Sequence, residues 1–209
     1  MMRHLPGILA MAAIVVASNI LVQFLILDGL LTWGAFTYPL AFLVTDLMNR
    51  IYGVAAARRV VLAGFIVGVI SSLIGSQIML EHGPAVALRV AVASATAFLV
   101  AQLMDVAIFD RLRSGAWWRA PLISTIAGST VDSALFFTIA FAQSLAVFGP
   151  EADAAISWAW ESLPFVLIGP DAPLWVTLAV TDWGVKILVG LLALIPFRLI
   201  VTKVSQDIV

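Results

Sequence analysis

Apolar stretches long enough to cross a bilayer as helices dominate this sequence of 209 residues. Crossing the hydrocarbon core takes about 20 predominantly apolar residues in helical conformation. The chain is 63% hydrophobic and only 11% charged, whereas soluble domains carry about 25% charged residues. We therefore predict an all-α membrane protein, a single six-helix transmembrane domain over residues 1–209. The predicted spans are residues 8–27, 31–51, 60–80, 86–109, 122–148 and 174–199.

Lys and Arg are concentrated in the connections on one side of these spans, a distribution typical of the cytoplasmic side. Only Arg89 lies near the other side. Both termini are therefore predicted to be cytoplasmic. Residues 149–173, which are rich in Asp and Glu, are predicted to form an extracytoplasmic acidic loop with a short interfacial helix, or alternatively a lid. The basic residues on the predicted cytoplasmic side are Arg3, Arg58, Arg59, Arg111, Arg113, Arg119, Arg198 and Lys203, with Arg50 close to it.

Charged residues lie inside or at the rim of the predicted spans. A charge near the centre of a bilayer costs about 2.5–3.5 kcal/mol on insertion scales, and such residues usually mark a substrate or ion path. We expect the function of the chain to depend on them. They are Asp46, Arg50, Asp105, Asp132, Asp182 and Lys186.

Spacing divides these charges into two classes. Asp46 and Arg50 are four residues apart, as are Asp182 and Lys186, so each pair lies on one helical face and can form an ion pair. Such pairs would line or gate a path, or serve as a conformational latch that touches no substrate. Asp105 and Asp132 have no such neighbour. Their partners must be groups on other helices, water, a substrate or a bound proton. We hypothesise proton-linked transport in which one of the two acids is protonated.

Other polar and aromatic residues are candidates for a binding face. Ser129 lies within one turn of Asp132, Asn19 and Gln23 are four residues apart, and Gln102 occupies a place in its span that corresponds to Asp46 and Asp182 in similar segments. Helix packing is the alternative role for the small and amide residues. Phe36 and Trp183 could stack on a planar ligand, or could pack against helices and lipid.

Several function classes are excluded by what the sequence lacks. It has no cysteine and two histidines, both outside the predicted spans, so a catalytic dyad inside the membrane is not expected. No phosphate-binding glycine loop, dinucleotide fingerprint or compact metal-ligand spacing occurs, although acids from different helices could meet around an ion. We predict that the protein is not an enzyme and has neither a cofactor nor a metal site. Any ATPase that energises it must be another polypeptide.

Short runs distributed from the first predicted span to the sixth also carry a family resemblance. They include Ser18-Asn19, Thr32-Trp33-Gly34-Ala35-Phe36, Thr45-Asp46-Leu47, Arg50-Ile51-Tyr52-Gly53, Ala57-Arg58-Arg59, Trp117-Trp118, and Asp182 with Lys186. In order and spacing they resemble the bacterial queuosine-precursor transporter family, also called the vitamin uptake transporter family. Many members have Glu where this chain has Arg50. The Arg form is similar to the branch associated with uptake of 7-cyano-7-deazaguanine.

The resemblance implies a multi-pass importer of this base, or also of its aminomethyl relative, in the bacterial inner membrane. Transport would be proton-linked or facilitative, and the fold would be related to the substrate-binding subunits of energy-coupling-factor transporters. The alternative is such a subunit itself, which needs an ATPase module. Expected partners are a deazapurine and the lipid bilayer, with a homodimer as an open alternative and no nucleic acid.

The polar residues suit such a substrate. A deazaguanine presents a ring N–H beside an exocyclic amine, and a carboxylate can accept both hydrogen bonds. We assign this donor edge to Asp132, with supporting contacts from Asn19, Gln23 and Gln102. The expected site also includes Asp46, Asp105, Ser129 and the aromatic rings of Phe36 and Trp183, with Arg50, Asp182 and Lys186 as gating or ion-pair residues.

Overall fold

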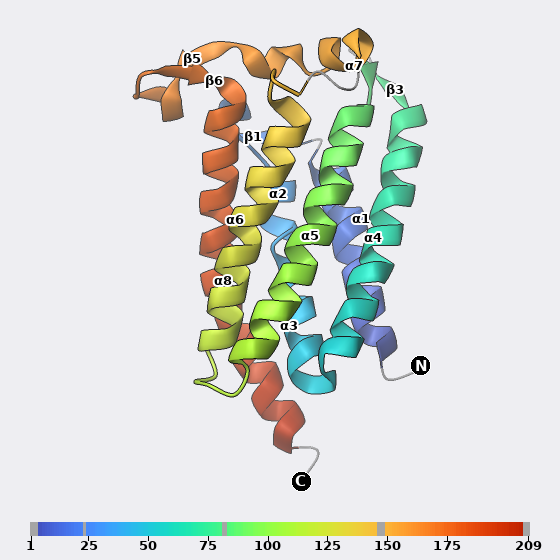
Figure 1. The fold of residues 1–209 in the computed structure, drawn as a ribbon, viewed down its shortest axis with the longest axis vertical. Coiled ribbons are helices and arrows are strands. Elements are labelled where there is room, and N and C mark those ends of the chain that lie inside the picture. Colours follow the sequence, from blue (N-terminus) through green and yellow to red (C-terminus); the bar gives the residue numbers. More distant parts are fainter. Residues whose placement is uncertain (1–3, 23, 81–82, 146–148, 207–209) are drawn as a thin grey trace.

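The structure, a computed structural model, describes residues 4–22, 24–80, 83–145 and 149–206. The chain forms a mostly helical bundle whose long helices run along one common axis (Figure 1). Four of the described helices, α4, α5, α6 and α8, are long and apolar enough to cross a membrane. The helices are α1 Leu5–Leu21, α2 Gly34–Thr37, α3 Leu40–Tyr52, α4 Val54–Gln77, α5 Leu88–Leu112, α6 Arg119–Phe141, α7 Pro150–Ala154 and α8 Leu174–Gln206.

The second predicted span is not one continuous helix, contrary to our prediction. Residues 31–32 are a strand, and the helix that follows is interrupted between α2 and α3 at Tyr38 and Pro39. Proline has no backbone N–H and its ring clashes with the preceding turn, so it kinks or breaks a helix. Pro39 nevertheless keeps near-helical angles, φ −61° and ψ −19°. The path from Gly34 to Tyr52 therefore continues for roughly 28 Å at 1.5 Å per residue.

The ends of two other predicted spans also differ. The first was expected to continue to residue 27, but α1 ends at Leu21 and the chain turns into a small hairpin. The third begins at Val54 instead of residue 60, because a single residue, Gly53, separates α3 from α4. Gly53 has φ +84°, a conformation that glycine adopts readily. The chain thus reverses direction within one residue.

The short strands and 3₁₀ turns lie toward the end of the bundle opposite the start of α1 and the end of α8 (Figure 1). Three antiparallel hairpins pair Leu25 with Thr32, Met79 with Pro84, and Ser162 with Pro173 at their outer positions. Residues 149–173 stretch across this end as α7, two 3₁₀ turns and the last hairpin. The strands are β1 Leu25–Ile26, β2 Leu31–Thr32, β3 Met79–Leu80, β4 Gly83–Pro84, β5 Ser162–Pro164 and β6 Asp171–Pro173, and the 3₁₀ turns are η2 Leu27–Gly29, η3 Ser157–Trp160 and η4 Phe165–Leu167.

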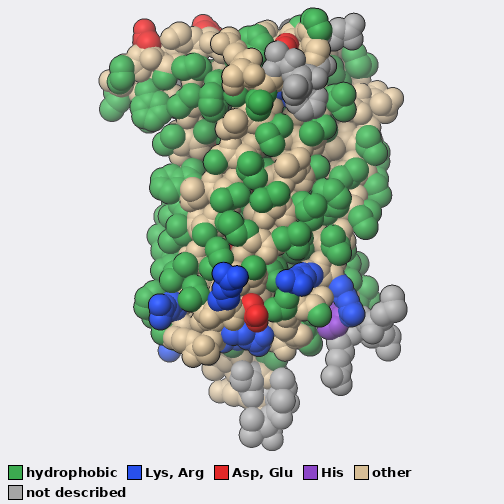
Figure 2. All heavy atoms as spheres, viewed as in Figure 1, with side chains coloured by type: hydrophobic (Ala, Val, Ile, Leu, Met, Phe, Trp, Pro, Cys, Tyr) green, Lys and Arg blue, Asp and Glu red, His purple; other side chains and the backbone are tan. Residues whose placement is uncertain are grey.

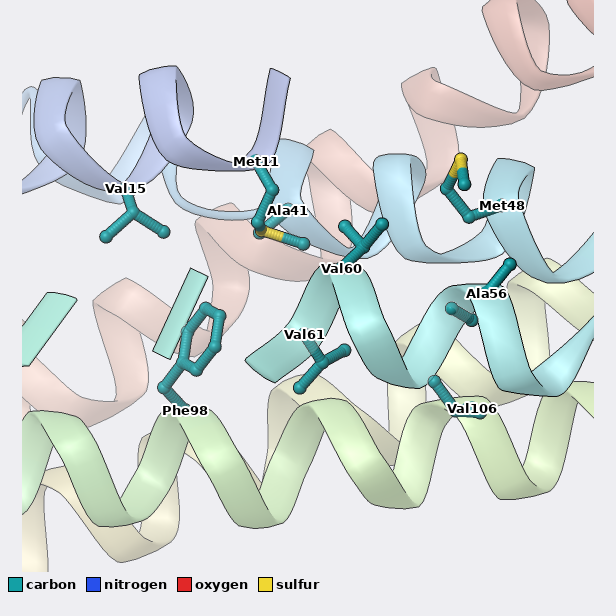
Figure 3. Close-up of a cluster of buried hydrophobic side chains, with 10 residues drawn as sticks. Met11, Val15, Ala41, Met48, Ala56, Val60, Val61, Phe98 and Val106 are labelled. Atoms are coloured by element: carbon teal, nitrogen blue, oxygen red, sulfur yellow. The ribbon is translucent and has the colours of Figure 1, made fainter. Parts of the chain in front are cut away.

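The largest apolar cluster lies between α1, α3, α4 and α5. Met11 and Val15 of α1 meet Val60 and Val61 of α4 and Phe98 of α5, as Figure 3 shows. Small residues permit this close approach, as is common between membrane helices. A Cβ at Gly64 of α4 would lie 2.5 Å from Cγ of Met11. The cluster fixes α1 and α4 on one side of the polar interior described below.

Charge is distributed unequally along the bundle. Figure 2 shows a broad apolar belt, with Lys and Arg side chains gathered toward one end. The same end carries the start of α1 and the finish of α8 (Figure 1). Arg89, at the start of α5, lies toward the other end, as do the exposed acids Glu161 and Asp171. Exposed basic residues at the ends of the helices are Arg58, Arg59, Arg111, Arg119, Arg198 and Lys203.

Candidate functional site

Helix α6 carries one polar face along most of its length. Small and hydroxyl-bearing residues recur there at helical spacing and are buried against neighbouring helices. They form two levels, one near the start of α6 and one about two turns later. The buried polar residues and glycine of this face are Ser124, Thr125, Gly128, Ser129, Asp132 and Ser133.

The level two turns along α6 is an ion network of Lys186, Asp132, Asp182, Tyr38 and Ser133. Nζ of Lys186 lies 2.6 Å from Oδ2 of Asp132 on α6 and 2.5 Å from Oδ2 of Asp182 on its own helix, α8. It also donates to the Ser133 hydroxyl at 3.1 Å. The side chains of Lys186 and Asp132 are 5% and 4% exposed. One lysine therefore joins α6 to α8 inside the bundle.

Tyr38 connects this network to the break between α2 and α3. Its hydroxyl donates to Oδ1 of Asp132 at 2.8 Å, and its ring centroid lies 5.2 Å from Nζ of Lys186. Ser133 donates to Oδ2 of Asp182 at 2.9 Å. Breaking a buried ion pair of this kind by removing one partner typically costs about 3–5 kcal/mol. The network thus ties three elements together at the helix break.

The predicted pair between Asp182 and Lys186 is therefore present, but it is not self-contained. Asp132, which has no charged neighbour on α6, finds Lys186 and Tyr38 on other elements. Two carboxylates share one ammonium, so the fully ionised network carries a net charge of one negative unit. A ligand that donates hydrogen bonds suits such a network.

The other level is a carboxyl layer of Asp46 on α3 and Asp105 on α5, near the start of α6. Ser124 and Thr125 donate to the two oxygens of Asp46 at 3.3 and 3.4 Å. Asp105 is fully buried and lies close enough to Asp46 to act on it electrostatically. Ser124 also lies near Asp105, yet among the described residues no group is at bonding distance and angle to either Asp105 oxygen.

Asp46 and Arg50 do not form the predicted ion pair. Arg50 instead donates to the carbonyl of Arg113 at 2.6 Å, and its guanidinium lies 5.4 Å from the ring centroid of Phe109. Arg50 is in the last turn of α3, where its long side chain reaches the end of α5, whereas Asp46 is satisfied by hydroxyls of α6. A spacing of four residues permits a pair but does not impose one.

Further buried polar atoms near the carboxyl layer lack a hydrogen-bond partner within the described part of the chain. Thr45 donates to Oε1 of Gln102 at 2.7 Å, which leaves Nε2 of Gln102 unbonded. Asn49 donates to the Val106 carbonyl at 3.0 Å, which leaves its Oδ1 unbonded. The Ser129 hydroxyl is also unbonded. Because buried polar groups almost always have partners, these atoms are candidate contacts for a ligand or water.

Two members of this polar interior had no assigned role at the sequence level. Asn49 is fully buried. In the sequence, its position three residues after Asp46, on the same helical face, was the one indication that it belongs to the site. Tyr38 was not among the predicted site residues, and the position of its hydroxyl depends on the break at Tyr38 and Pro39. A cavity of about 10 Å³, roughly room for one water, adjoins Asp46 and Thr125 between α3, α6 and α8.

Several predicted site residues lie away from both levels. The amide of Asn19 donates to the Val15 carbonyl of its own helix at 2.9 Å. Trp183 is 40% exposed and donates to the Thr130 hydroxyl at 3.0 Å on the outer surface. The ring of Phe36 packs at 6.0 Å from that of Trp33. Gln23 is outside the described residues, among which no group of three or more potential metal ligands occurs.

Comparison with known protein families adds the decisive observation. The family described as "Putative vitamin uptake transporter" matches residues 32–201, a range that contains both the ion network and the carboxyl layer. The chain belongs to this family. The resemblance inferred from the sequence is thereby confirmed, and so is the expectation of a transporter rather than an enzyme.

Two named relatives match this chain over most of its length. The "Queuosine precursor transporter" of Escherichia coli K12 is 34% identical over 199 residues, which are 88% of this chain and 79% of the relative. The "Probable queuosine precursor transporter" of Haemophilus influenzae is 34% identical over 176 residues, 79% of this chain and 66% of the relative. No solved structure matches the chain.

Proposed function

We propose that this protein imports a queuosine precursor, 7-cyano-7-deazaguanine, across the bacterial inner membrane, and accepts the aminomethyl form of the base as well. The names and coverage of the two relatives support the substrate class. The buried ion network supports the transport role, because ionisable residues inside a membrane usually line a substrate or ion path. The protein works as a secondary transporter that needs no ATPase subunit.

In this proposal the chain crosses the membrane six times, with α1, the combined α2 and α3, α4, α5, α6 and α8. The basic end faces the cytoplasm, in accordance with the preference of Lys and Arg for that side. Both termini are then cytoplasmic, and residues 149–173 form an extracytoplasmic segment. The broken second crossing resembles the discontinuous helices that carry binding sites in many transporters.

The observation that carries the binding mechanism is the sharing of Lys186 between Asp132 and Asp182. The ring N–H and exocyclic amine of a deazaguanine can take the place of the Lys186 ammonium on Asp132, since a carboxylate accepts both hydrogen bonds. Lys186 keeps its pair with Asp182 on the same helix and can donate to the carbonyl of the base. After the exchange Asp182 remains paired with Lys186, and the charge of Asp132 is stabilised by hydrogen bonds from the base and from Tyr38.

Growth of cells that cannot synthesise deazapurines tests this function. Supplied with 7-cyano-7-deazaguanine, cells that produce the protein should regain queuosine in their transfer RNA. Asp132→Asn should lower apparent affinity at least tenfold, since a hydrogen bond to a charged group contributes about 1.5–3 kcal/mol. The control Asp171→Asn changes an exposed acid of β6 and should transport normally. Normal affinity in a well-expressed Asp132→Asn variant would refute the assignment.

A further inference from the structure

We propose that Asp46 and Asp105 form a proton-binding site that is separate from the substrate site and couples transport to a proton gradient. The inference rests on the proposed transport function for its coupling role. The two sites lie at different levels along α6. Ser124 contacts the carboxyl layer, whereas Asp132 belongs to the ion network. These residues are eight positions apart, or roughly 12 Å along the helix. The nearer acid of the layer, Asp105, has its Cβ beside Gly128, which lies four positions or roughly 6 Å from Asp132 along the helix. The two sites are therefore adjacent levels built from different residues.

Charge is the first argument for a proton at this layer. Two buried carboxylates that face each other repel strongly, and such pairs in proteins commonly share one proton. The charged groups that act on the pair within the described residues are the two acids themselves and Arg50. Arg50 donates instead to the Arg113 carbonyl. From α6 the layer receives only the hydroxyls of Ser124 and Thr125.

Hydrogen bonding is the second, independent argument. Both oxygens of Asp105 and Oδ1 of Asn49 are fully buried acceptors without a donor among the described residues. An ionised carboxylate has no hydrogen to give, whereas a protonated one supplies an O–H. A proton on Asp105 removes the negative charge that no donor stabilises, and the resulting O–H can donate to Asp46. Asp46 suits the acceptor role because two hydroxyls already stabilise its charge.

Packing favours a proton over a metal ion. A Cβ at Gly128 would lie 2.7 Å from Cε1 of Phe42 and 3.4 Å from Cβ of Asp105, so helices α3, α5 and α6 are closely packed around the pair. Metal ions such as Ca²⁺ or Mg²⁺ need about six or more oxygen ligands around them. A proton needs no such space. The cavity beside Asp46 and Thr125 has room for the water that would deliver it.

The same structure suggests how the two sites communicate. Asp46 lies on α3, and Tyr38 lies in the break that precedes α3. At the carboxyl layer, protonation changes the contact between Asp46 on α3 and Asp105 on α5. At the ion network, bound substrate changes the hydrogen bonds of Asp132, to which Tyr38 donates. Both events act on the segment formed by α2 and α3. This segment is the coupling element of the proposal.

Infrared spectroscopy of the purified, substrate-free protein tests the proton site directly. The carbonyl stretch of a protonated carboxyl group should be present at neutral pH and disappear in Asp105→Asn. Asp46→Asn, the second variant, should shift it. The control Asp110→Asn removes a partly exposed acid on the same helix, paired with Arg113, and should leave the band unchanged. Absence of the band from the wild type, or its survival in Asp105→Asn, would overturn the proposal.

Transport by proteoliposomes tests the coupling. An inward proton gradient should drive accumulation of labelled base by the wild type, whereas Asp105→Asn should exchange base across the membrane without accumulating it. Accumulation by Asp105→Asn, accumulation driven only by a sodium gradient, or no gradient-driven accumulation by the wild type would contradict the coupling role. If the infrared band is present but the wild type neither takes up nor exchanges the base, the proposed substrate fails while the proton site stands.

Discussion

At the scale of single residues, the arrangement depends on one position without a side chain. Gly128 allows α6 to approach Phe42 of α3 and Asp105 of α5 at the same level. Inserting atoms into a well-packed interior forces side chains and backbone to shift. The position of Asp105 beside Asp46 therefore depends on the absence of a Cβ at Gly128.

Gly128→Ala should destabilise the protein by about 1–3 kcal/mol, the typical cost of overpacking. Gly184→Ala is the matched control, because a Cβ there would have no atom within 4 Å. Alanine also favours helix over glycine, so this control should be neutral or slightly stabilising. Thermal unfolding in detergent measures both variants. Equal stability of Gly128→Ala and wild type would show that the three helices are not packed as closely as described.

The residue scale also shows what spacing can and cannot predict. The pair of Asp182 and Lys186 was predictable from its separation along one helix. The same separation failed for Asp46 and Arg50, because hydroxyls and a carbonyl on other helices provided alternative partners. Lys186 reaches Asp132 on the adjacent helix α6. The local sequence around either residue does not predict this contact.

At the scale of elements, Arg89 fastens residues 149–173 to the ends of two helices. Its guanidinium donates to the carbonyls of Ile139 and Ala142 at 2.8 and 2.5 Å, at the end of α6, and to Asp153 at 2.7 Å. The last carbonyls of a helix have no partner within that helix. Arg89 is fully buried, so it satisfies them where water does not reach.

Arg89→Met should lower the free energy of unfolding by about 3 kcal/mol, since it leaves a carboxylate and two carbonyls without their donor. Asp153→Asn should cost less, because an amide oxygen can still accept from Arg89. The matched control Arg59→Met changes an exposed arginine of α4 and should stay within about 0.5 kcal/mol. Chemical or thermal unfolding checks all three. An Arg89→Met variant as stable as the control would exclude this role.

The same scale separates predictable elements from unpredictable ones. Helices α4, α5, α6 and α8 follow from long apolar runs, and their existence was predicted correctly, although α4 starts earlier than expected and α6 ends at Phe141 instead of residue 148. The break between α2 and α3 was missed because Leu, Ala and Phe on both sides of Pro39 keep the segment apolar. Hydropathy measures apolar length but does not show where a helix is interrupted.

At the scale of the whole molecule, two features define the proposed transporter. Basic side chains gather at one end, and the segment of residues 149–173 covers the other (Figures 1 and 2). Between these ends the polar interior is closely packed, with a cavity of about 10 Å³ at the carboxyl layer. A planar base is far larger than a water. In the proposed function, binding of the base beside Asp132 therefore involves a second arrangement in which α2 and α3 move relative to α6 and α8.

Counterflow of labelled 7-cyano-7-deazaguanine into proteoliposomes that contain only this purified protein tests the central claim most directly. Vesicles preloaded with unlabelled base should take up label in proportion to the protein reconstituted, and protein-free vesicles should not. Unlabelled adenine, which lacks the carbonyl and the amine beside a ring N–H, should compete poorly. Label uptake that appears only after an ATPase module is added, or that never appears with correctly folded protein, would contradict a self-sufficient importer of this base.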